Sequence, residues 1–204
     1  MNADNSKEQI LQKALTLFSA HGYDGTGIQD ITGGAGVTKP TLYYFFGSKD
    51  GLFEAVWETY FPLIENPLKR CCFYENHITD YENDVYGQLI HIATVFFDSA
   101  HSSPEFYRLM METVYAPPES KVSTLSLAYF NRLYALLEQF FTGAARAHGN
   151  LTGREHTFAV SFLAQINAYI GIWLVLPETD QTRPLLDKNS AHLLVKQFMH
   201  GIFA

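Results

Sequence analysis

A short run of polar and aromatic side chains near the N-terminus carries the clearest chemistry in this sequence. The run holds Lys39, Thr41, Tyr43 and Tyr44. On a helix capped by Thr38, these side chains share the exposed first turns, while Leu42 and Phe46, four residues apart, face inward. An ammonium group, a hydroxyl and two phenols can each hydrogen-bond a phosphate or a base edge. The run therefore predicts a surface that binds DNA.

A second short helix is predicted directly before this one. Thr26 can cap it, and Ile28 and Ile31 fall on one face. Three glycines, Gly33, Gly34 and Gly36, then end the helix and turn the chain. Lys39 and Pro40 fill the first turn of the following helix, where the missing N–H of proline costs nothing. Two short helices joined by a glycine turn form the pattern of a helix-turn-helix.

Two longer helices must hold this pair in place. One is predicted from a cap at Ser6 to Ala20, with an apolar stripe at helical spacing and an end at Gly22. The other begins after a cap at Ser48 and ends or kinks near Pro62. We expect this last helix to be the only link between the DNA-binding segment and the rest of the chain.

The segment TGIQDITGGAGVTKPTLYYFFGSK, residues 26–49, resembles the DNA-binding signature of the TetR family of transcriptional regulators. The matching residues are Gly22, Tyr23, Thr26, Ile31, Ala35, Gly36, Val37, Thr38, Lys39, Pro40, Thr41, Leu42, Tyr43, Tyr44, Phe46, Ser48, Lys49, Leu52 and Phe53. The close resemblance covers roughly residues 7–60. It implies an all-α fold with a three-helix DNA-binding domain in residues 1–47, followed by a helical effector-binding and dimerisation domain in residues 48–204. The implied function is a repressor that a small molecule releases from a palindromic operator.

The predicted partner of this segment is double-stranded DNA with an inverted repeat. The predicted DNA-binding residues are Thr26, Gln29, Thr38, Lys39, Pro40, Thr41, Tyr43, Tyr44 and Lys49. Lys39 can donate to guanine O6 or N7, and the amide of Gln29 can pair with adenine, a role that the resemblance also implies. Thr38, Tyr44 and Lys49 are expected to anchor phosphates. Packing in the core is the alternative for the two tyrosines.

The charge of the chain excludes a protein that coats nucleic acid without sequence preference. The formal net charge is −7, and residues 1–55 carry four lysines against six acidic residues. Nonspecific binding rests on neutralising phosphates, which an acidic protein does poorly. Between Asp30 and Asp50, however, the only charged residues are Lys39 and Lys49. A locally positive surface on an acidic chain favours a dimer that contacts few phosphates per subunit.

The rest of the chain shows helical periodicity and no strand or hairpin signal. Helices are predicted at about residues 82–100, from Pro104 to a stop at Pro117, at Lys121–Ala147, from Thr152 or Gly153 to Pro177, and at Ser190–Ile202. The fold class is therefore all-α.

One predicted helix lacks charge. From His156 to Pro177 there is no Asp, Glu, Lys or Arg, and the run is long enough to cross a bilayer. Gln165 and Asn167 lie near its middle, and its flanks show no clear basic bias. We favour a helix buried on nearly all sides in the protein or its dimer over a membrane span. The N-terminus lacks the pattern of a signal peptide, so a cytoplasmic protein without membrane contact is predicted.

An effector pocket among the middle helices follows from the resemblance. Its candidate lining residues are His91, Tyr107, Met110, Met111, Phe130, Tyr134, Phe162, Gln165, Tyr169 and Trp173. Plain core packing is the alternative for each of them. An aromatic, mostly uncharged lining suits an apolar or aromatic small molecule, and Glu112 and Glu138 leave a cationic one open.

The last two predicted helices are rich in apolar side chains and are the candidate homodimer surface. The predicted interface residues are Phe158, Ile170, Leu194, Phe198 and Ile202. Pairing there would place two DNA-binding segments on successive turns of the duplex.

No residue set predicts catalysis, a metal or a cofactor. The eight histidines are scattered, and no HExxH, CxxC, GxSxG, GxGxxG or Walker pattern occurs. Cys71 and Cys72 are adjacent in sequence and predict reduced thiols, with a redox role as the open alternative. The rival function is a helical protein that binds or sequesters small molecules and has no operator.

Overall fold

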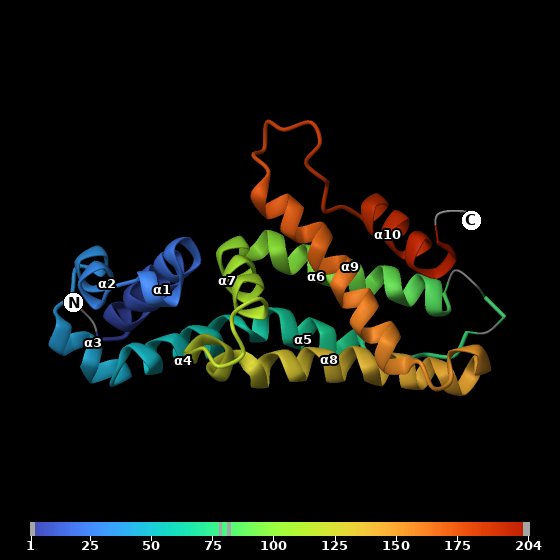
Figure 1. Cartoon of the computed structure of the whole chain (residues 1–204), viewed down its shortest axis with the longest axis horizontal. Helices are drawn as coiled ribbons and strands as arrows, with labels where there is room; N and C mark the ends of the chain where they lie inside the picture. Colours follow the sequence, from blue (N-terminus) through green and yellow to red (C-terminus); the bar gives the residue numbers. More distant parts are fainter. Residues whose placement is uncertain (1–2, 78, 81–82, 202–204) are drawn as a thin grey trace. The chain divides into compact units, whose positions relative to one another are not determined.

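The structure is a computed structural model that describes residues 3–77, 79–80 and 83–201. Every regular element in this part of the chain is a helix, as the sequence predicts (Figure 1). In order, the helices are α1 (Ala3–Gly25), α2 (Ile28–Ala35), α3 (Lys39–Phe46), α4 (Lys49–Tyr60), α5 (Pro62–Cys71), α6 (Val85–Ser102), α7 (Pro104–Val114), α8 (Lys121–Ala147), the 3-10 turn η1 (Gly149–Leu151), α9 (Glu155–Val175) and α10 (Lys188–His200).

The chain divides into two compact units. One, here called the reader unit, holds Met1–Pro62 together with Glu105–Leu127, and the other, the body unit, holds Leu63–Pro104 together with Ala128–Ala204. The reader unit thus contains most of α7 and the first turns of α8. The expectation that α4 is the only link is therefore wrong, because α8 also begins in the reader unit and continues into the body unit.

Aromatic rings form the core of the reader unit. Phe53 meets Phe18 and Tyr23 edge to face, with ring centres 5.3 and 5.2 Å apart. Farther along α4, Trp57 meets Phe106 of α7 at 5.3 Å. Rings in such pairs add about 0.5–1.5 kcal/mol beyond the burial of their area. This cluster fastens α1, α4 and α7 to one another.

The helix before the helix-turn-helix begins earlier than predicted and breaks at the predicted residue, Gly22. α1 begins at Ala3, so Ser6 lies inside it, and the helix ends at Gly25 after a break at Gly22, where φ is 71°. A residue with a side chain would be strained at that φ. The Oε1 atom of Glu112 would also lie 2.6 Å from any Cβ placed there. Gly22 therefore ends the first, longer part of α1, as predicted, and a short helical stretch follows to Gly25.

The cap predicted for α2 is also wrong. Thr26 is buried, and its hydroxyl donates to the carbonyls of Leu17 and Gly22, at 3.1 and 2.8 Å. The N-cap is Gly27, whose N–H donates to Asp30 at 3.2 Å. The Thr26 hydroxyl thus links the start of α2 to the break in α1. Because both of its hydrogen bonds go to carbonyls of α1, it does not cap α2.

The turn and the following caps agree better with the prediction. Gly36 is the left-handed C-cap of α2, with φ 66°, although Gly33 and Gly34 lie inside the helix. Thr38 caps α3 and Ser48 caps α4, as predicted. α4 ends at Tyr60 and α5 begins at Pro62, which confirms the expected interruption.

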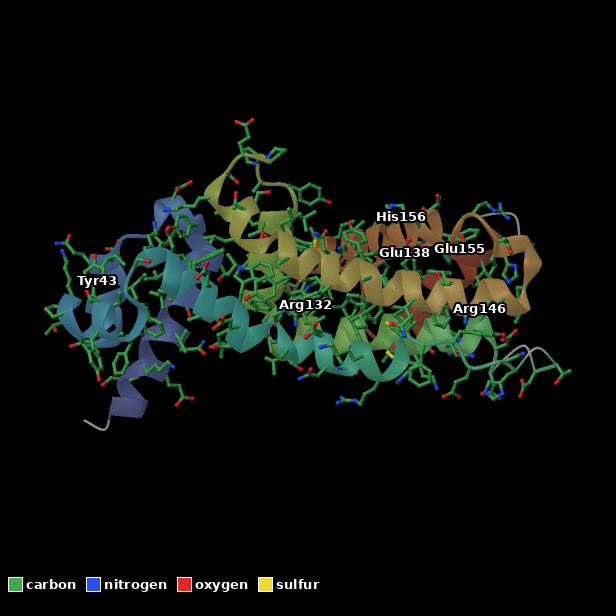
Figure 2. All side chains as sticks on the ribbon, turned by 90° about the horizontal axis from the view of Figure 1, so that it is seen from below. Tyr43, Arg132, Glu138, Arg146, Glu155 and His156 are labelled. Carbon is green, nitrogen blue, oxygen red and sulfur yellow. The ribbon has the colours of Figure 1, made fainter. Side chains whose placement is uncertain are left out.

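In the body unit, α6 packs against both α9 and α10. The largest buried side chains there include Phe96, Phe97, Phe140, Phe141 and Phe162. The body unit also holds a buried carboxylate, that of Glu65 on α5. It accepts hydrogen bonds from Arg132 of α8 and from Lys69, the latter at 2.9 Å. Figure 2 labels Arg132 on α8.

The uncharged helix is less buried than predicted. α9 has the length and composition of a membrane span, with a mean hydropathy of 1.7, and 28% of that window is buried in the single chain. A single chain thus does not bury α9 on nearly all sides, and its burial in a dimer stays a prediction. α6 and α10 pack against α9, and Phe141 of α8 meets two of its rings. Val160, Ile172 and Val175 of α9 stay exposed.

Candidate nucleic-acid interface

The first turns of α3 present the predicted reading surface. Lys39 is exposed, Thr41 is half-buried, and Tyr43 and Tyr44 are 45% and 82% exposed. Leu42 and Phe46 of the same helix are buried, as predicted. Core packing is therefore not the role of either tyrosine in this chain. Figure 2 labels Tyr43 at the surface of the reader unit.

Thr38 and Thr41 form a small hydroxyl pair at the start of α3. The hydroxyl of Thr38 accepts from the N–H of Thr41 at 3.4 Å, and the two hydroxyl oxygens lie 2.9 Å apart. This pairing holds both side chains beside Lys39 in one arrangement. A helix N-terminus with organised hydroxyls is suited to contact a phosphate.

Lys49, a predicted phosphate anchor, is engaged with the protein itself. Its ammonium lies 4.3 Å from the ring centre of Tyr23. Burial, the largest effect, lowers the pKa of Lys49, although Asp24 and Asp50 partly oppose it. The cation is therefore held at the start of α4, and its role as a phosphate anchor stays a prediction.

The carboxylate of Asp50 on α4 contacts side chains of two other helices of the reader unit, α1 and α8. Tyr23 of α1 donates its hydroxyl to the Asp50 carboxylate, and Lys121 of α8 pairs with the same group at 2.6 Å. Hydrogen bonds from Lys121 and then from Tyr23 hold the pKa of Asp50 below its ordinary value. Burial, followed by the Asp50 hydrogen bond, raises the pKa of Tyr23, which stays a phenol. Sequence reasoning missed Lys121, because no local pattern connects it with Asp50.

The other predicted DNA-binding residues lie on the same unit in different settings. Gln29 is exposed on α2, and Pro40 is exposed in the first turn of α3. Thr26 is buried, and its hydroxyl donates to two carbonyls of α1, so it positions the start of α2 and does not face solvent. The exposed members of the predicted DNA-binding set are therefore Gln29, Thr38, Lys39, Pro40, Tyr43 and Tyr44.

The predicted effector-pocket residues are divided between the two units. Tyr107, Met110 and Met111 belong to the reader unit, whereas His91, Phe130, Tyr134, Phe162, Gln165, Tyr169 and Trp173 belong to the body unit. Tyr107 and Phe162 are fully buried, and Tyr169 stacks on Phe97 at 5.7 Å. The ring of Trp173 is covered by the guanidinium of Arg183, 4.6 Å from its centre. His91 lines a surface hollow of about 620 Å³.

Two of the predicted dimer residues lie in the core of their own chain. Ile170 is fully buried and Leu194 nearly so, which leaves them no area to offer a second subunit. Phe158 and Phe198 are half-buried in a ring cluster with Phe162, and Ile202 lies outside the described residues. We therefore correct the candidate interface to the exposed side of the same helices, where the large apolar residues are Val160, Ile172, Val175 and Leu193.

The glycine C-cap of α2 and the capped α3 that follows it form a helix-turn-helix. Residues 10–56 match the family model described as "Bacterial regulatory proteins, tetR family". Residues 10–56 thus carry a DNA-binding domain of the TetR type.

Curated relatives agree over the same segment. The chain is 40% identical over 60 residues to the biofilm operon icaADBC HTH-type negative transcriptional regulator IcaR of Staphylococcus aureus, and 43% identical over 54 residues to the HTH-type transcriptional repressor ComR of Escherichia coli. These matches cover 29% and 26% of this chain, and 32% and 26% of the two relatives. The chain thus spans a third or less of the length of the relatives it matches.

Solved structures extend the likeness to the whole fold. A TetR-like transcriptional regulator from Rhodococcus sp. RHA1 superposes with a TM-score of 0.71 at 18% identity, covering 98% of this chain and 96% of that one. The transcriptional regulator FadR from Bacillus subtilis, in complex with stearoyl-CoA, superposes with a TM-score of 0.75 at 13% identity, covering 96% and 98%. Both show the fold, which includes the helical body.

Proposed function

We propose that this chain is a sequence-specific, DNA-binding repressor that acts as a cytoplasmic homodimer and leaves its inverted-repeat operator when a small molecule binds. The observation that carries the proposal is the exposed group Lys39, Thr41, Tyr43 and Tyr44 on a capped α3 within a TetR-type domain. As in the prediction, residues 1–47 would form the DNA-binding domain and residues 48–204 the effector-binding and dimerisation domain.

In this proposal, some of the side chains contact bases and others contact phosphates. Lys39 would donate to a guanine and Gln29 would pair with adenine, while Thr38 and Tyr44 would hold phosphates. Lysine lacks the bidentate fork of arginine, and no arginine occurs before Arg70. Each subunit would therefore bind weakly, and affinity would depend on two subunits reading two half-sites.

Release by an effector requires that the small molecule prefer one of two conformations. α8 is one continuous helix whose first residue, Lys121, is paired with Asp50 beside the cap of α4. A shift of α8 would move the start of α4 and, through Ser48, the end of α3. The effector would be apolar or aromatic, a class that includes the acyl chain of the ligand seen with the Bacillus regulator.

The test is a selection of bound sequences from random oligonucleotides and genomic fragments at about 100 mM salt. The expected result is an inverted repeat, whose enrichment is lost in the double variant Lys39→Ala, Tyr44→Ala. The variant Lys7→Ala, at an exposed position of α1, serves as the matched control. Compounds that release the selected fragment would then identify the effector.

The second candidate is a helical protein that binds or sequesters small molecules and has no operator. The acidic balance of residues 1–55 is the observation that favours it. Failure of the wild-type chain to enrich any sequence, while it remains folded and dimeric, would support this candidate and reject the first.

A further inference from the structure

Three side chains that are far apart in sequence meet at one end of the body unit. The hydroxyl of Tyr74 donates to Oδ1 of Asp84 at 2.5 Å, and Nε2 of His148 lies 2.8 Å from Oδ2 of Asp84. The same Nε2 is 3.1 Å from the Tyr74 hydroxyl. Asp84 precedes α6 and His148 follows α8, and Figure 1 shows the start of α6 and the end of α8 at the same end of the body unit.

The carboxylate at the centre of this cluster is buried. Asp84 is 6% exposed, and it caps α6 without giving its side chain to the helix N–H groups. A buried carboxylate is costly unless donors satisfy it. Tyr74 and His148 supply those donors. Burial, followed by the Asp84 hydrogen bond, raises the pKa of Tyr74, so the phenol keeps its proton.

The hydrogen bonds decide the tautomer of His148. Because a carboxylate only accepts, Nε2 must carry the hydrogen that it shares with Asp84. When the ring is neutral, Nδ1 is then an acceptor, and none of the described residues forms a hydrogen bond with it. Part of this imidazole, about a quarter of its surface, remains accessible to solvent.

A pocket of about 250 Å³ opens beside the cluster. Its apolar lining comes from Val85, Leu151 and Met199. Its polar lining comes from Asp84, His148, Asn150 and Tyr86, whose hydroxyl lies 3.3 Å from Nδ1 of His192. An apolar pocket with a few convergent polar groups is the usual form of a small-molecule site.

The lining determines the chemistry of the occupant. The Asp84 carboxylate disfavours an anion, and both of its oxygens already accept hydrogen bonds, which leaves little gain for a cation. The volume is below that of a drug-sized site. We propose that this pocket binds a small, uncharged, mostly apolar molecule with one hydroxyl, which donates to His148. This site is separate from the effector residues predicted from the sequence, and it does not require that the chain bind DNA.

The test uses three probes of the same skeleton, namely benzyl alcohol, benzylamine and benzoate, with the full-length protein. Benzyl alcohol is expected to bind with a Kd on the order of 1 mM, as few-atom ligands do, and the two charged probes at least about tenfold more weakly. Binding is measured by ligand-observed NMR and by the shift of the His148 ring nitrogens. Equal or tighter binding of either charged probe, or no binding of benzyl alcohol at about 20 mM, overturns the proposal.

Variants locate the site. Leu151→Trp fills the pocket from a half-buried position, and His148→Phe removes the acceptor, so each is expected to weaken benzyl alcohol binding about tenfold. The matched control is His156→Phe, an exposed histidine of the same unit, which should leave binding unchanged. If the His148→Phe variant does not fold, the loss or survival of benzyl alcohol binding in Leu151→Trp alone tests the location of the site. Benzyl alcohol binding that survives Leu151→Trp in a folded protein rejects the assignment.

Discussion

At the scale of single residues, the proposed DNA interface contains few charged side chains, and Lys39 is the exposed one on α3. Between Asp30 and Asp50 the chain offers Lys39 and Lys49, and Lys49 lies over the ring of Tyr23. Tyr44 is 82% exposed, and its ring meets the ring of its neighbour Phe45 edge to face, at 5.2 Å. The reading surface therefore depends on one exposed cation and several uncharged hydrogen-bonding groups.

Replacing Lys39 by alanine tests whether that cation reads a base. We expect Lys39→Ala to relax the preference at one base pair of each half-site by about 1–3 kcal/mol, because a guanine contact discriminates by that amount. Competition binding with operators changed at single positions measures it, with Lys7→Ala as control. Uniform weakening for all sequences, with a salt slope reduced by about 1, would show a phosphate contact.

At the scale of the helix, two glycines of α2 have different roles. Gly33 lies inside α2 with no atom within 4 Å of a Cβ built on it, whereas Gly36 is the left-handed cap. The same substitution should therefore have opposite effects at the two positions.

Gly33→Ala is expected to stabilise the protein by about 0.5–1 kcal/mol, because alanine loses less backbone freedom in a helix. Gly36→Ala is expected to destabilise it by about 1 kcal/mol, since φ there is 66°. Chemical denaturation measures both. Operator affinity of Gly33→Ala should stay unchanged, and a lower melting temperature for that variant would refute the prediction.

The pair of Glu65 and Arg132 connects α5 with α8. The Glu65 side chain is 4% exposed and that of Arg132 is 48% exposed, so solvent screens one end of the pair. Burial by itself raises the pKa of Glu65, but hydrogen bonds from Arg132 and Lys69 outweigh it, and the net pKa lies below its ordinary value of 4.5. The folded state therefore favours the charged carboxylate.

Glu65→Gln should cost about 2 kcal/mol, less than for a fully buried pair because Arg132 is half exposed. In the wild type, this stabilisation is present above about pH 4.5 and is lost as the pH falls through the lower pKa of the folded state. Urea denaturation at several pH values measures it. Glu138→Gln, which loses only an exposed pair with His156 (Figure 2), should change little, and equal effects of both variants would contradict the assignment.

At the scale of the whole molecule, α9 leaves an apolar side exposed in the single chain. Its exposed side carries Ala164, Ala168, Ile172 and Val175, spaced by three or four residues along a helix that has no charged residue after Glu155. Such a continuous apolar side is unusual on a monomer and typical of a subunit interface. We expect a second copy to cover it, related by a two-fold axis.

Ala168→Arg places a charge on this side and should convert the dimer to a folded monomer. Sedimentation equilibrium and circular dichroism measure the two properties, and operator binding should fall with the dimer. Thr142→Arg, at an exposed position of α8, is the matched control. An Ala168→Arg protein that stays dimeric would exclude this side of α9 as the interface.

Local patterns predicted much of the fold and of the reading surface. Thr38 and Ser48 cap their helices as expected, and α8 begins and ends at the predicted residues, Lys121 and Ala147. Caps and apolar periodicity act within one or two turns, so neighbouring residues are sufficient to predict them. The exposure of Tyr43 and Tyr44 follows from the same periodicity.

The sequence by itself determined most of the helices, the caps at Thr38 and Ser48, and the grouping of Lys39, Thr41, Tyr43 and Tyr44 on one helix. These features depend on contacts over a few residues. Tertiary structure alone decided that Thr26 turns back to α1, that Lys121 reaches Asp50, and that Tyr74, Asp84 and His148 meet around a pocket. The physical reason is that a hydrogen-bonding side chain takes whichever partner the packed helices bring near. Which partner that is depends on long-range packing, and no spacing along the chain encodes it.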